Sequence, residues 1–249
     1  MSENQVLVSV VTVAYNSEKT IRKTIEAVLN QTYPYVEYWI IDGASKDGTV
    51  AIAKEYEDKF AKKGYAYHIV SEPDAGIYDA MNKGCQKATG QIVGIINSDD
   101  WYEPNALFVA AHTFMEEQYD MFYADVRLIK EDGTSMIKHS RYRKFATSRD
   151  WNHPTTFVRR EIYDIYSYQC KTVHDDWDFV LKLRAAGCKI VVKNVVLANF
   201  CVGGASNNGG LQKAVSRCRA RYGIYRQNGM SRLYLIECIA MEVAKAILK

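Results

Sequence analysis

Two adjacent acids, Asp99 and Asp100, follow an apolar run at residues 92–96 that predicts a strand buried on both faces. Open α/β sheets bind their ligands at the carboxyl ends of such strands. A turn that aims both carboxylates at one point would make a site for a hard divalent cation, which commonly carries phosphate oxygens. Ser98 and the two acids could equally cap a helix that starts near Pro104.

The bulk composition restricts the class of protein. The chain has 249 residues, 48% of them hydrophobic, which suffices for one large α/β domain or for a domain with a helical appendage. A formal net charge of only +3 argues against nucleic acid as a partner. The N-terminus lacks the pattern of a secretory signal, and the cysteines at positions 85, 170, 188, 201, 218 and 238 form no Cys-x-x-Cys pair. We therefore expect reduced thiols and a cytoplasmic location.

The first hundred residues alternate between strand and helix patterns. Strands are expected at residues 6–13, 36–41, 66–70 and 92–96. The helices between them include one with Ile52, Tyr56 and Phe60 on a single face, and another at residues 77–88. This order predicts an α/β fold with a mostly parallel sheet that is flanked by helices and joined by right-handed crossovers.

The order changes after about residue 105. We expect a helix at 105–117, a strand at 121–125, a segment at 130–149 too charged for a core element, and apolar periodicity again at 177–186 and 189–200. The glycine-rich residues 203–210 predict a flexible loop or linker. We accordingly expect a catalytic domain at residues 1–210 and a C-terminal helical extension at 211–249.

Polar side chains follow each of the first four predicted strands. They include Tyr15, Asp42, Asp74 and Asp99, and a shared edge with such groups suits a nucleotide site. No Gly-x-Gly-x-x-Gly follows the first strand and no Gly-Lys-Ser/Thr loop occurs, so neither a dinucleotide fold nor a P-loop is expected. Bound phosphates would be held through a metal ion.

Five ordered segments between residues 6 and 200 resemble the family 2 glycosyltransferases, which are inverting, nucleotide-sugar-dependent enzymes of the GT-A fold. The matching segments are residues 10–16 (VVTVAYN), 41–49 (IDGASKDGT), 71–84 (SEPDAGIYDAMNKG), 97–102 (NSDDWY) and 174–178 (HDDWD). Five motifs in the family's order make a chance match very unlikely. The resemblance implies a GT-A type α/β fold and transfer of a sugar.

The resemblance implies roles for three residues around the base of the nucleotide. Tyr15, with Val13 beside it, resembles the position whose ring packs on the base. Asp42 resembles the acid that accepts the uracil N3 hydrogen, a contact that only an acceptor can make. The alternatives are a core aromatic for Tyr15 and a turn into Gly43 for Asp42.

The diphosphate end of the donor site departs from the family pattern. Residues 97–100 occupy the place of the family's Asp-x-Asp type metal motif, with Asn97 where the first acid would stand. The resemblance therefore assigns a Mg²⁺ or Mn²⁺ site to Asp99 and Asp100. It leaves open which acid is the main metal ligand and which faces the ribose. The resemblance places Asn82 in the nucleotide-sugar site, but Met81 stands where many relatives have arginine. Lys83 is then a candidate diphosphate contact, or equally a solvated helix lysine.

Residues 174–178 carry the acid that the resemblance implies to be catalytic. Asp176 matches the general base that deprotonates the acceptor hydroxyl, a role that suits a well-placed carboxylate. Asp175 would be its neighbour on the acceptor side, and Asp178 a structural acid. Asp175 and Asp176 could instead favour the start of a helix through its dipole. His153 lies in a segment that resembles the acceptor loop, where it would contact acceptor or diphosphate, although a lone histidine is more often structural.

The resemblance implies an inverting hexosyltransferase that moves a sugar from a nucleotide diphosphate donor, expected to be UDP-linked, to a hydroxyl group. The acceptor would be a glycan or lipid-linked glycan in cell-surface polysaccharide synthesis. A catalytically inactive nucleotide-sugar-binding module and a nucleotidyltransferase are the alternatives. The sequence does not identify the sugar or the acceptor.

The C-terminal residues 211–249 combine five arginines with an apolar stripe. The stripe comprises Ile236, Ile239, Ala240, Val243 and Ile247. This pattern suits peripheral contact with an anionic membrane surface, here the inner face of the cell membrane. Packing of the stripe on the catalytic domain explains it equally well, and some arginines could reach the donor diphosphate. The sequence leaves these three readings open.

Overall fold

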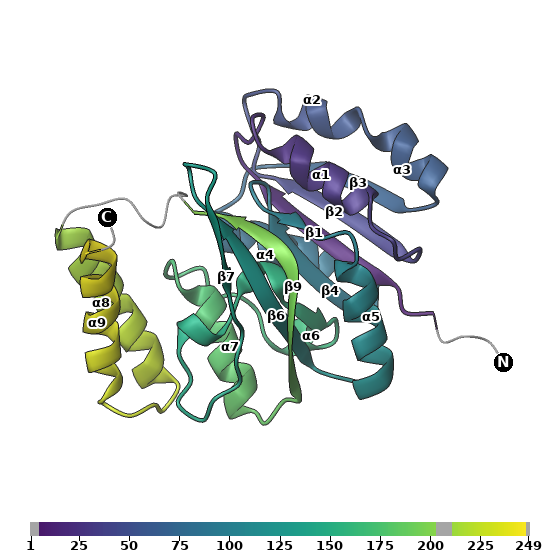
Figure 1. Ribbon diagram of the computed structural model, residues 1–249. Helices are drawn as coiled ribbons and strands as arrows, with labels where there is room; N and C mark the ends of the chain where they lie inside the picture. The colour runs from purple at the N-terminus through teal and green to yellow at the C-terminus, as the bar shows by residue number, and fades with distance from the viewer. Residues whose placement is uncertain (1–4, 203–210, 248–249) are drawn as a thin grey trace. The chain divides into compact units, whose positions relative to one another are not determined.

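The computed structural model describes residues 5–202 and 211–247 of the chain (Figure 1). The described residues form two compact units, one of residues 5–167 with 189–202 and the other of residues 168–188 with 211–247. The structure therefore groups residues 168–188 with the C-terminal helices, and the boundary at residue 210 stays a prediction. The expected flexible stretch at 203–210 lies outside the described residues.

The first unit begins with four parallel strands in the order β3-β2-β1-β4. They are β1 (Val8–Ala14), β2 (Val36–Asp42), β3 (Ala66–Ser71) and β4 (Ile92–Asn97). All seven residues of β1 are buried, because helices cover both of its faces. These strands confirm the predicted parallel half of the sheet.

Alternate side chains of β1 pack against different helices. Val8 and Val10 share a core with α1 (Ile21–Leu29), α2 (Thr49–Lys54), α3 (Glu57–Lys63) and α5 (Ala106–Glu117). Val11 faces the opposite way and meets α4 (Ile77–Lys87) at Gly84. The two helix layers follow from the period-2 geometry of a strand.

One predicted helix is two helices in the structure. The predicted face of Ile52, Tyr56 and Phe60 is retained, but α2 ends at Lys54 and α3 begins at Glu57. At the break, the Tyr56 hydroxyl donates to Glu26 Oε1 at 2.6 Å and accepts from Arg22 Nη1 at 2.9 Å, both on α1. The side-chain periodicity survives the break because Tyr56 and Phe60 stay fully buried.

The rest of the sheet is mixed. Strand β8 (Phe157–Arg159) is antiparallel to β4 and to β6 (Met121–Ile129), β9 (Ile190–Cys201) is parallel to β6, and β5 (Trp101–Tyr102) is antiparallel to β9. Strand β7 (Ser135–Lys138) pairs with β6 within the segment expected to be too charged for a core element. Its residues are exposed or half-buried, so the sequence has no pattern of buried apolar residues here that would predict a strand. Short helices η1 (Ser148–Asp150), η2 (His153–Thr155) and α6 (Ile162–Ile165) complete the unit.

The second unit is helical. It contains α7 (Asp175–Ala185), α8 (Leu211–Gln227) and α9 (Tyr234–Ile247). Its core includes the ring of Trp177, which meets that of Tyr225 edge-on at 6.3 Å, and the ring of Tyr234 stacked on Tyr225 at 4.2 Å. Within the described residues, no helix has both the length and the apolarity needed to cross a membrane.

Gly84 allows α4 to approach β1 closely, which generates the first prediction. A Cβ there would lie 2.3 Å from Val11 Cγ1 and 3.2 Å from Ile41 Cγ1. We expect Gly84→Ala to lower the free energy of unfolding in urea by about 1–3 kcal/mol through overpacking. The matched control is Gly223→Ala in α8, where an added Cβ meets nothing within 4 Å. That change should stabilise the chain by up to about 1 kcal/mol. Equal effects of the two changes would contradict the close approach.

Candidate active site

Four parallel strands deliver polar residues to one edge of the sheet. The register pairs Ala14 with Asp42, Asp42 with Ser71, and Val13 with Asn97. The segments that follow these residues therefore start side by side at the carboxyl edge. Tyr15, Asp42 and the Asn97–Asp100 turn all belong to this edge, as the sequence predicted.

Asp42 is fully buried and anchors two loops. Its Oδ2 accepts hydrogen bonds from Ser45 N at 2.9 Å and Ser71 Oγ at 2.6 Å, and its Oδ1 accepts a short one from Ser45 Oγ. The bond from Ser45 N is the turn that the sequence offered as the alternative. Oδ1 keeps capacity for a further donor, because a carboxylate oxygen accepts two. The contact with uracil stays a prediction.

Tyr15 lies at the same edge and is 63% exposed, so it is not a core aromatic, while Val13 is buried beneath it in the strand. Across the edge, Gly43 lies against Asp74, since a Cβ on Gly43 would come within 2.4 Å of Asp74 Oδ2. An exposed ring beside closely packed loops offers a flat apolar surface. Such a surface suits stacking of a planar ligand.

Lys83 is engaged with groups of its own neighbourhood. Its Nζ donates to Pro73 O at 2.8 Å and lies 3.2 Å from Glu72 Oε1 and 3.4 Å from Asp79 Oδ2. It thus ties α4 to the loop after β3 and is not simply solvated. Asn82 beside it is half-buried. The roles of both residues in donor binding stay predictions.

The Asn97–Asp100 turn is held from two sides. Thr24 Oγ1 on α1 donates to Asp100 O at 2.6 Å, and Cys201 N at the end of β9 donates to Asp100 Oδ1 at 3.0 Å. The remaining acceptors, Asn97 Oδ1 and Asp100 Oδ2, are buried and have no hydrogen-bond partner. Buried acceptors are normally satisfied, so these two atoms mark a place prepared for a ligand.

The electrostatics of the turn favour a cation. Burial, reinforced by the neighbouring Asp99, raises the pKa of Asp100 well above its usual range, and burial also raises the pKa of Asp99. The ionised pair is therefore disfavoured in the ligand-free protein, and a positive charge would relieve that cost. The residues fit a hard divalent ion, because all their donor atoms are oxygens.

The protein contributes few ligands to such an ion. Among residues 5–202 and 211–247, no group of three or more His, Cys, Asp or Glu could hold a metal. An ion at this turn would take its other ligands from phosphate oxygens and water, as Mg²⁺ commonly does.

His153 lies in η2 near the ring of Trp151, with the ring centroids 5.8 Å apart. Burial lowers the pKa of its imidazole to about 4, so the ring is neutral at pH 7. A neutral ring can donate or accept one hydrogen bond but cannot neutralise a phosphate charge. The contact with acceptor or diphosphate stays a prediction.

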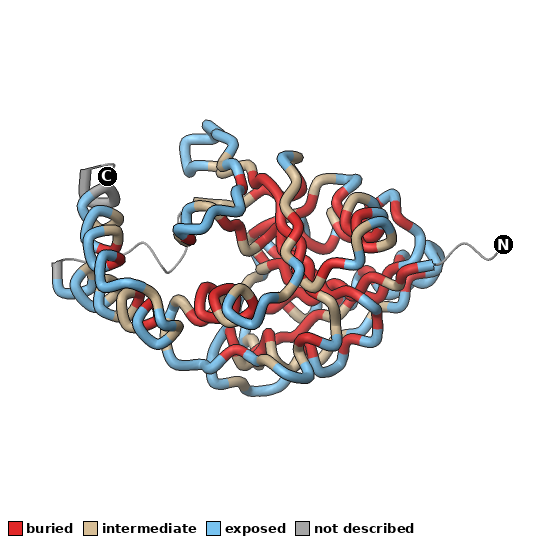
Figure 2. The backbone as a smooth tube through the Cα atoms, turned by 90° about the horizontal axis from the view of Figure 1, so that it is seen from below, coloured by how far each residue is buried: buried red, intermediate tan, exposed pale blue. Residues whose placement is uncertain are grey.

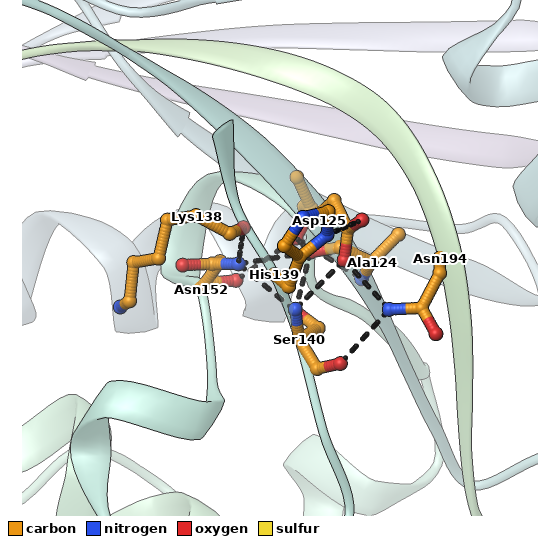
Figure 3. A network of polar contacts seen from close by, with 8 residues as sticks. Ala124, Asp125, Lys138, His139, Ser140, Asn152 and Asn194 are labelled. Atoms are coloured by element: carbon orange, nitrogen blue, oxygen red, sulfur yellow. Dashed lines mark hydrogen bonds and ion pairs between the residues drawn. The ribbon is translucent and has the colours of Figure 1, made fainter. Parts of the chain in front are cut away.

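A buried polar network fixes the segment that carries His153 (Figure 3). Asp125 in β6 accepts from Ser140 N at 2.7 Å and Asn194 Nδ2 at 3.0 Å, and lies 2.7 Å from the exposed His139 ring. Asn152, next to His153, donates to Ala124 O at 3.1 Å. Asn194 reaches Asp125 because β9 shifts register opposite this residue, the arrangement of a β-bulge.

No pattern in the sequence predicts this network. Its only local signal was a charged residue, Asp125, at the end of an apolar strand pattern. The partners that satisfy Asp125 lie at least 14 residues away along the chain, in the loop directly after β7 and on β9. No short-range pattern could have identified them.

In the second unit the three acids of α7 have different surroundings. Asp175 is buried and accepts from Lys171 N at 2.7 Å and Thr172 N at 2.8 Å. Asp178 accepts from Asn228 Nδ2 at 2.7 Å and pairs with Lys182 at 2.7 Å. Asp176 is only half-buried, and its Oδ1 accepts from Trp177 N at 2.7 Å. Asp175 and Asp178 thus anchor structure, while Asp176 is the most accessible of the three.

Comparison with known proteins identifies the family. Residues 9–178, more than half of the chain, match the profile of Glycosyl transferase family 2. A Bacillus subtilis (strain 168) protein named as a teichuronic acid biosynthesis glycosyltransferase, TuaG, is 34% identical over 133 residues, or 53% of this chain and 51% of that protein. The chondroitin synthase of Pasteurella multocida (strain Pm70) is 27% identical over 188 residues, or 73% of this chain and 19% of the synthase. The chain thus spans about half or less of the length of these relatives.

Solved structures share the fold. S. aureus TarS 1–349 in complex with UDP superposes with a TM-score of 0.67 at 18% identity, covering 95% of this chain and 70% of TarS 1–349. The mannosyltransferase PcManGT from Pyrobaculum calidifontis, in complex with GDP-Man and Mn²⁺, gives a TM-score of 0.65 at 16% identity, covering 98% and 76%. These likenesses confirm the predicted GT-A fold.

The second prediction concerns Asp125. Asp125→Ala would leave the buried Ser140 N–H and the Asn194 amide without their acceptor, so we expect the free energy of unfolding in urea to fall by about 2–4 kcal/mol. The control is Asp132→Ala, which removes an exposed acid that accepts only from Thr134 in the β6–β7 turn. That variant should lose less than about 1 kcal/mol. A near-neutral Asp125→Ala would mean that the network does not hold this segment.

Proposed function

The chain belongs to Glycosyl transferase family 2, and we propose that it transfers a sugar from a nucleotide diphosphate donor to a hydroxyl of a glycan or lipid-linked glycan. The observation that carries this proposal is the edge of four parallel strands, where Tyr15 is exposed and two acceptors of the Asn97–Asp100 turn are buried without a partner. The exposed ring suits the base of a nucleotide diphosphate. The turn, which favours a cation, suits its phosphates, and both lie on one edge of the sheet.

We infer that the donor is a UDP-sugar. The inference draws on the resemblance of Asp42, at the carboxyl end of β2, to the acid that accepts the uracil N3 hydrogen. It also draws on the TarS structures that hold UDP and UDP-GlcNAc, whereas PcManGT holds GDP-Man. Competition between UDP and GDP in a binding assay tests the choice of base.

The proposed reaction is a single displacement with inversion. Asp176 takes the proton of the acceptor hydroxyl as its oxygen bonds to the anomeric carbon, and the diphosphate leaves from the opposite face. A divalent ion held by Asp99 and Asp100 would supply positive charge to the leaving diphosphate. Asp175 and Asp178 hold the start of α7 in place through their own hydrogen bonds, which fixes the backbone on either side of Asp176.

The proposed setting is cell-surface polysaccharide synthesis in the cytoplasm, at the inner face of the membrane. The names of relatives support polysaccharide synthesis, since they include a teichuronic acid biosynthesis protein, a chondroitin synthase and a hyaluronan synthase. Release of free sugar and UDP, measured with and without acceptors, separates the proposal from its alternatives. A nucleotidyltransferase would release pyrophosphate, and an inactive module would bind a donor without turnover.

The third prediction tests the metal site. Asp99→Asn and Asp100→Asn should each weaken Mn²⁺-dependent UDP binding at least about tenfold in calorimetry, since each removes one charge that attracts the cation. EDTA should have the same effect on the wild type.

Asp100→Asn has a second readout and a control. It removes a buried charge, so without metal it should be at least as stable as the wild type. The control Asp58→Asn changes an exposed acid in α3 and should leave UDP binding unchanged. Wild-type affinity in both site variants would refute the assignment.

The fourth prediction concerns Asp176. Asp176→Asn keeps the size of the side chain and removes its basicity, so kcat should fall by about 10²–10⁴-fold while donor affinity survives. The donor is first identified by screening nucleotide sugars for protection against unfolding. The control Asp58→Asn, which changes an exposed acid in α3, should keep wild-type turnover. A variant at position 176 that retained more than about a tenth of wild-type kcat would point to another base.

A further inference from the structure

The helix α9 packs with polar groups inward. Glu242 faces α8, where its Oε2 accepts from Arg217 Nη2 at 2.7 Å and its Oε1 lies 3.5 Å from Arg221 Nη2. Arg221 is only 3% exposed. Tyr234 and Cys238 are buried on the same side. An ion pair therefore occupies the position between helices where apolar side chains normally lie.

The apolar side chains of α9 are exposed instead. The segment at its start and along its outer face carries Leu233, Leu235, Ile236, Ile239 and Val243, each between 42% and 67% exposed. Ala240 is exposed on the same stripe. Figure 2 shows long exposed stretches on both α8 and α9. The stripe predicted from the sequence thus exists, but its described side chains are not covered by the rest of their own unit. Ile247 lies outside the described side chains.

The exposed charged side chains of α8, α9 and the connection between them all have the same sign. The exposed charged side chains within residues 212–243 are Lys213, Arg219, Arg226 and Arg232, and the acids Glu237 and Glu242 are not exposed. The exposed charge on the two helices is therefore only positive. Arg232 directly precedes Leu233 and the stripe, whereas Arg219 and Arg226 lie on the side of α8 opposite Arg217 and Arg221. Arg217 and Arg221 form ion pairs with Glu242, so these two arginines are engaged within their own unit.

We propose that the exposed face of α9, with the exposed Arg232 at its start, docks on an anionic lipid surface. Aliphatic side chains would enter the bilayer to the depth of the headgroups while the arginine contacts lipid phosphates. At 14 residues, α9 is too short to span a bilayer, so it lies in the plane of the interface. A second copy of the chain is a poorer occupant, because a two-fold contact would oppose like charges.

Co-sedimentation of the full chain with vesicles tests the proposal. Vesicles of phosphatidylcholine alone are compared with vesicles that also contain phosphatidylglycerol, at low and high salt. The wild type should bind the anionic vesicles, more weakly at high salt and at least about tenfold more weakly without the anionic lipid. Arg232→Gln should reduce binding to anionic vesicles and its salt dependence.

The apolar face is tested by Ile236→Glu with Ile239→Glu, which should lower vesicle binding at least about tenfold. Both positions are exposed, so the variant should unfold in urea like the wild type; Ile236→Ser with Ile239→Ser serves if it does not. The matched control is Phe108→Glu with Ile165→Glu, which makes the same charge change at exposed apolar positions of α5 and α6. That control should bind vesicles like the wild type.

Three results would overturn the proposal. They are absence of wild-type binding at low salt, unchanged binding of the variants at positions 236 and 239, and equal loss of binding in the control. Measurement of the oligomeric state by light scattering could give a fourth result that overturns the proposal. If the wild type forms dimers that the same variants dissociate, and neither binds vesicles, the face is a contact between copies of the chain. None of these readouts depends on sugar transfer, so they stand apart from any failure of the proposed function.

Discussion

The parallel register of β1 with β2 and β4 is the constraint on which the candidate site depends. It sets Ala14 beside Asp42 and Val13 beside Asn97, so that the loops after three strands begin at one edge. A slip of one residue would exchange the side chains that face the two helix layers and would separate these loops, because side chains alternate along a strand. The full burial of β1 under two helix layers makes such a slip costly.

Within that frame, the protein treats its buried carboxylates in two ways. Asp42, Asp125 and Asp175 are each surrounded by donors, so their burial is compensated and they hold loops in place. Asp100 has a donor on one oxygen only, and its pKa is raised by burial and by Asp99. The uncompensated carboxylate is thus a local cost to the ligand-free fold. Such a cost is typical of sites that await a charged ligand.

In the C-terminal helices, a carboxylate between two helices is paired with arginines, and apolar side chains are exposed. The pairing of Glu242 with Arg217 and Arg221 removes charge from the surface of α9 and leaves its aliphatic side chains outside. Breaking such a buried pair is expensive, because it leaves an unpaired charge. The interior ion pair and the exposed apolar face are therefore two consequences of one choice of helix orientation.

The sequence by itself determined the four parallel strands, the acids at their ends and the apolar stripe of α9. These are local features, since an apolar run or a 3.6-residue period is written in neighbouring residues. The tertiary structure alone decided the break between α2 and α3, the partners of Asp125, and the different surroundings of Asp175, Asp176 and Asp178. It also decided which way the stripe of α9 points. A period shows that a helix has an apolar face, but what covers that face depends on groups distant in sequence, here the arginines of α8.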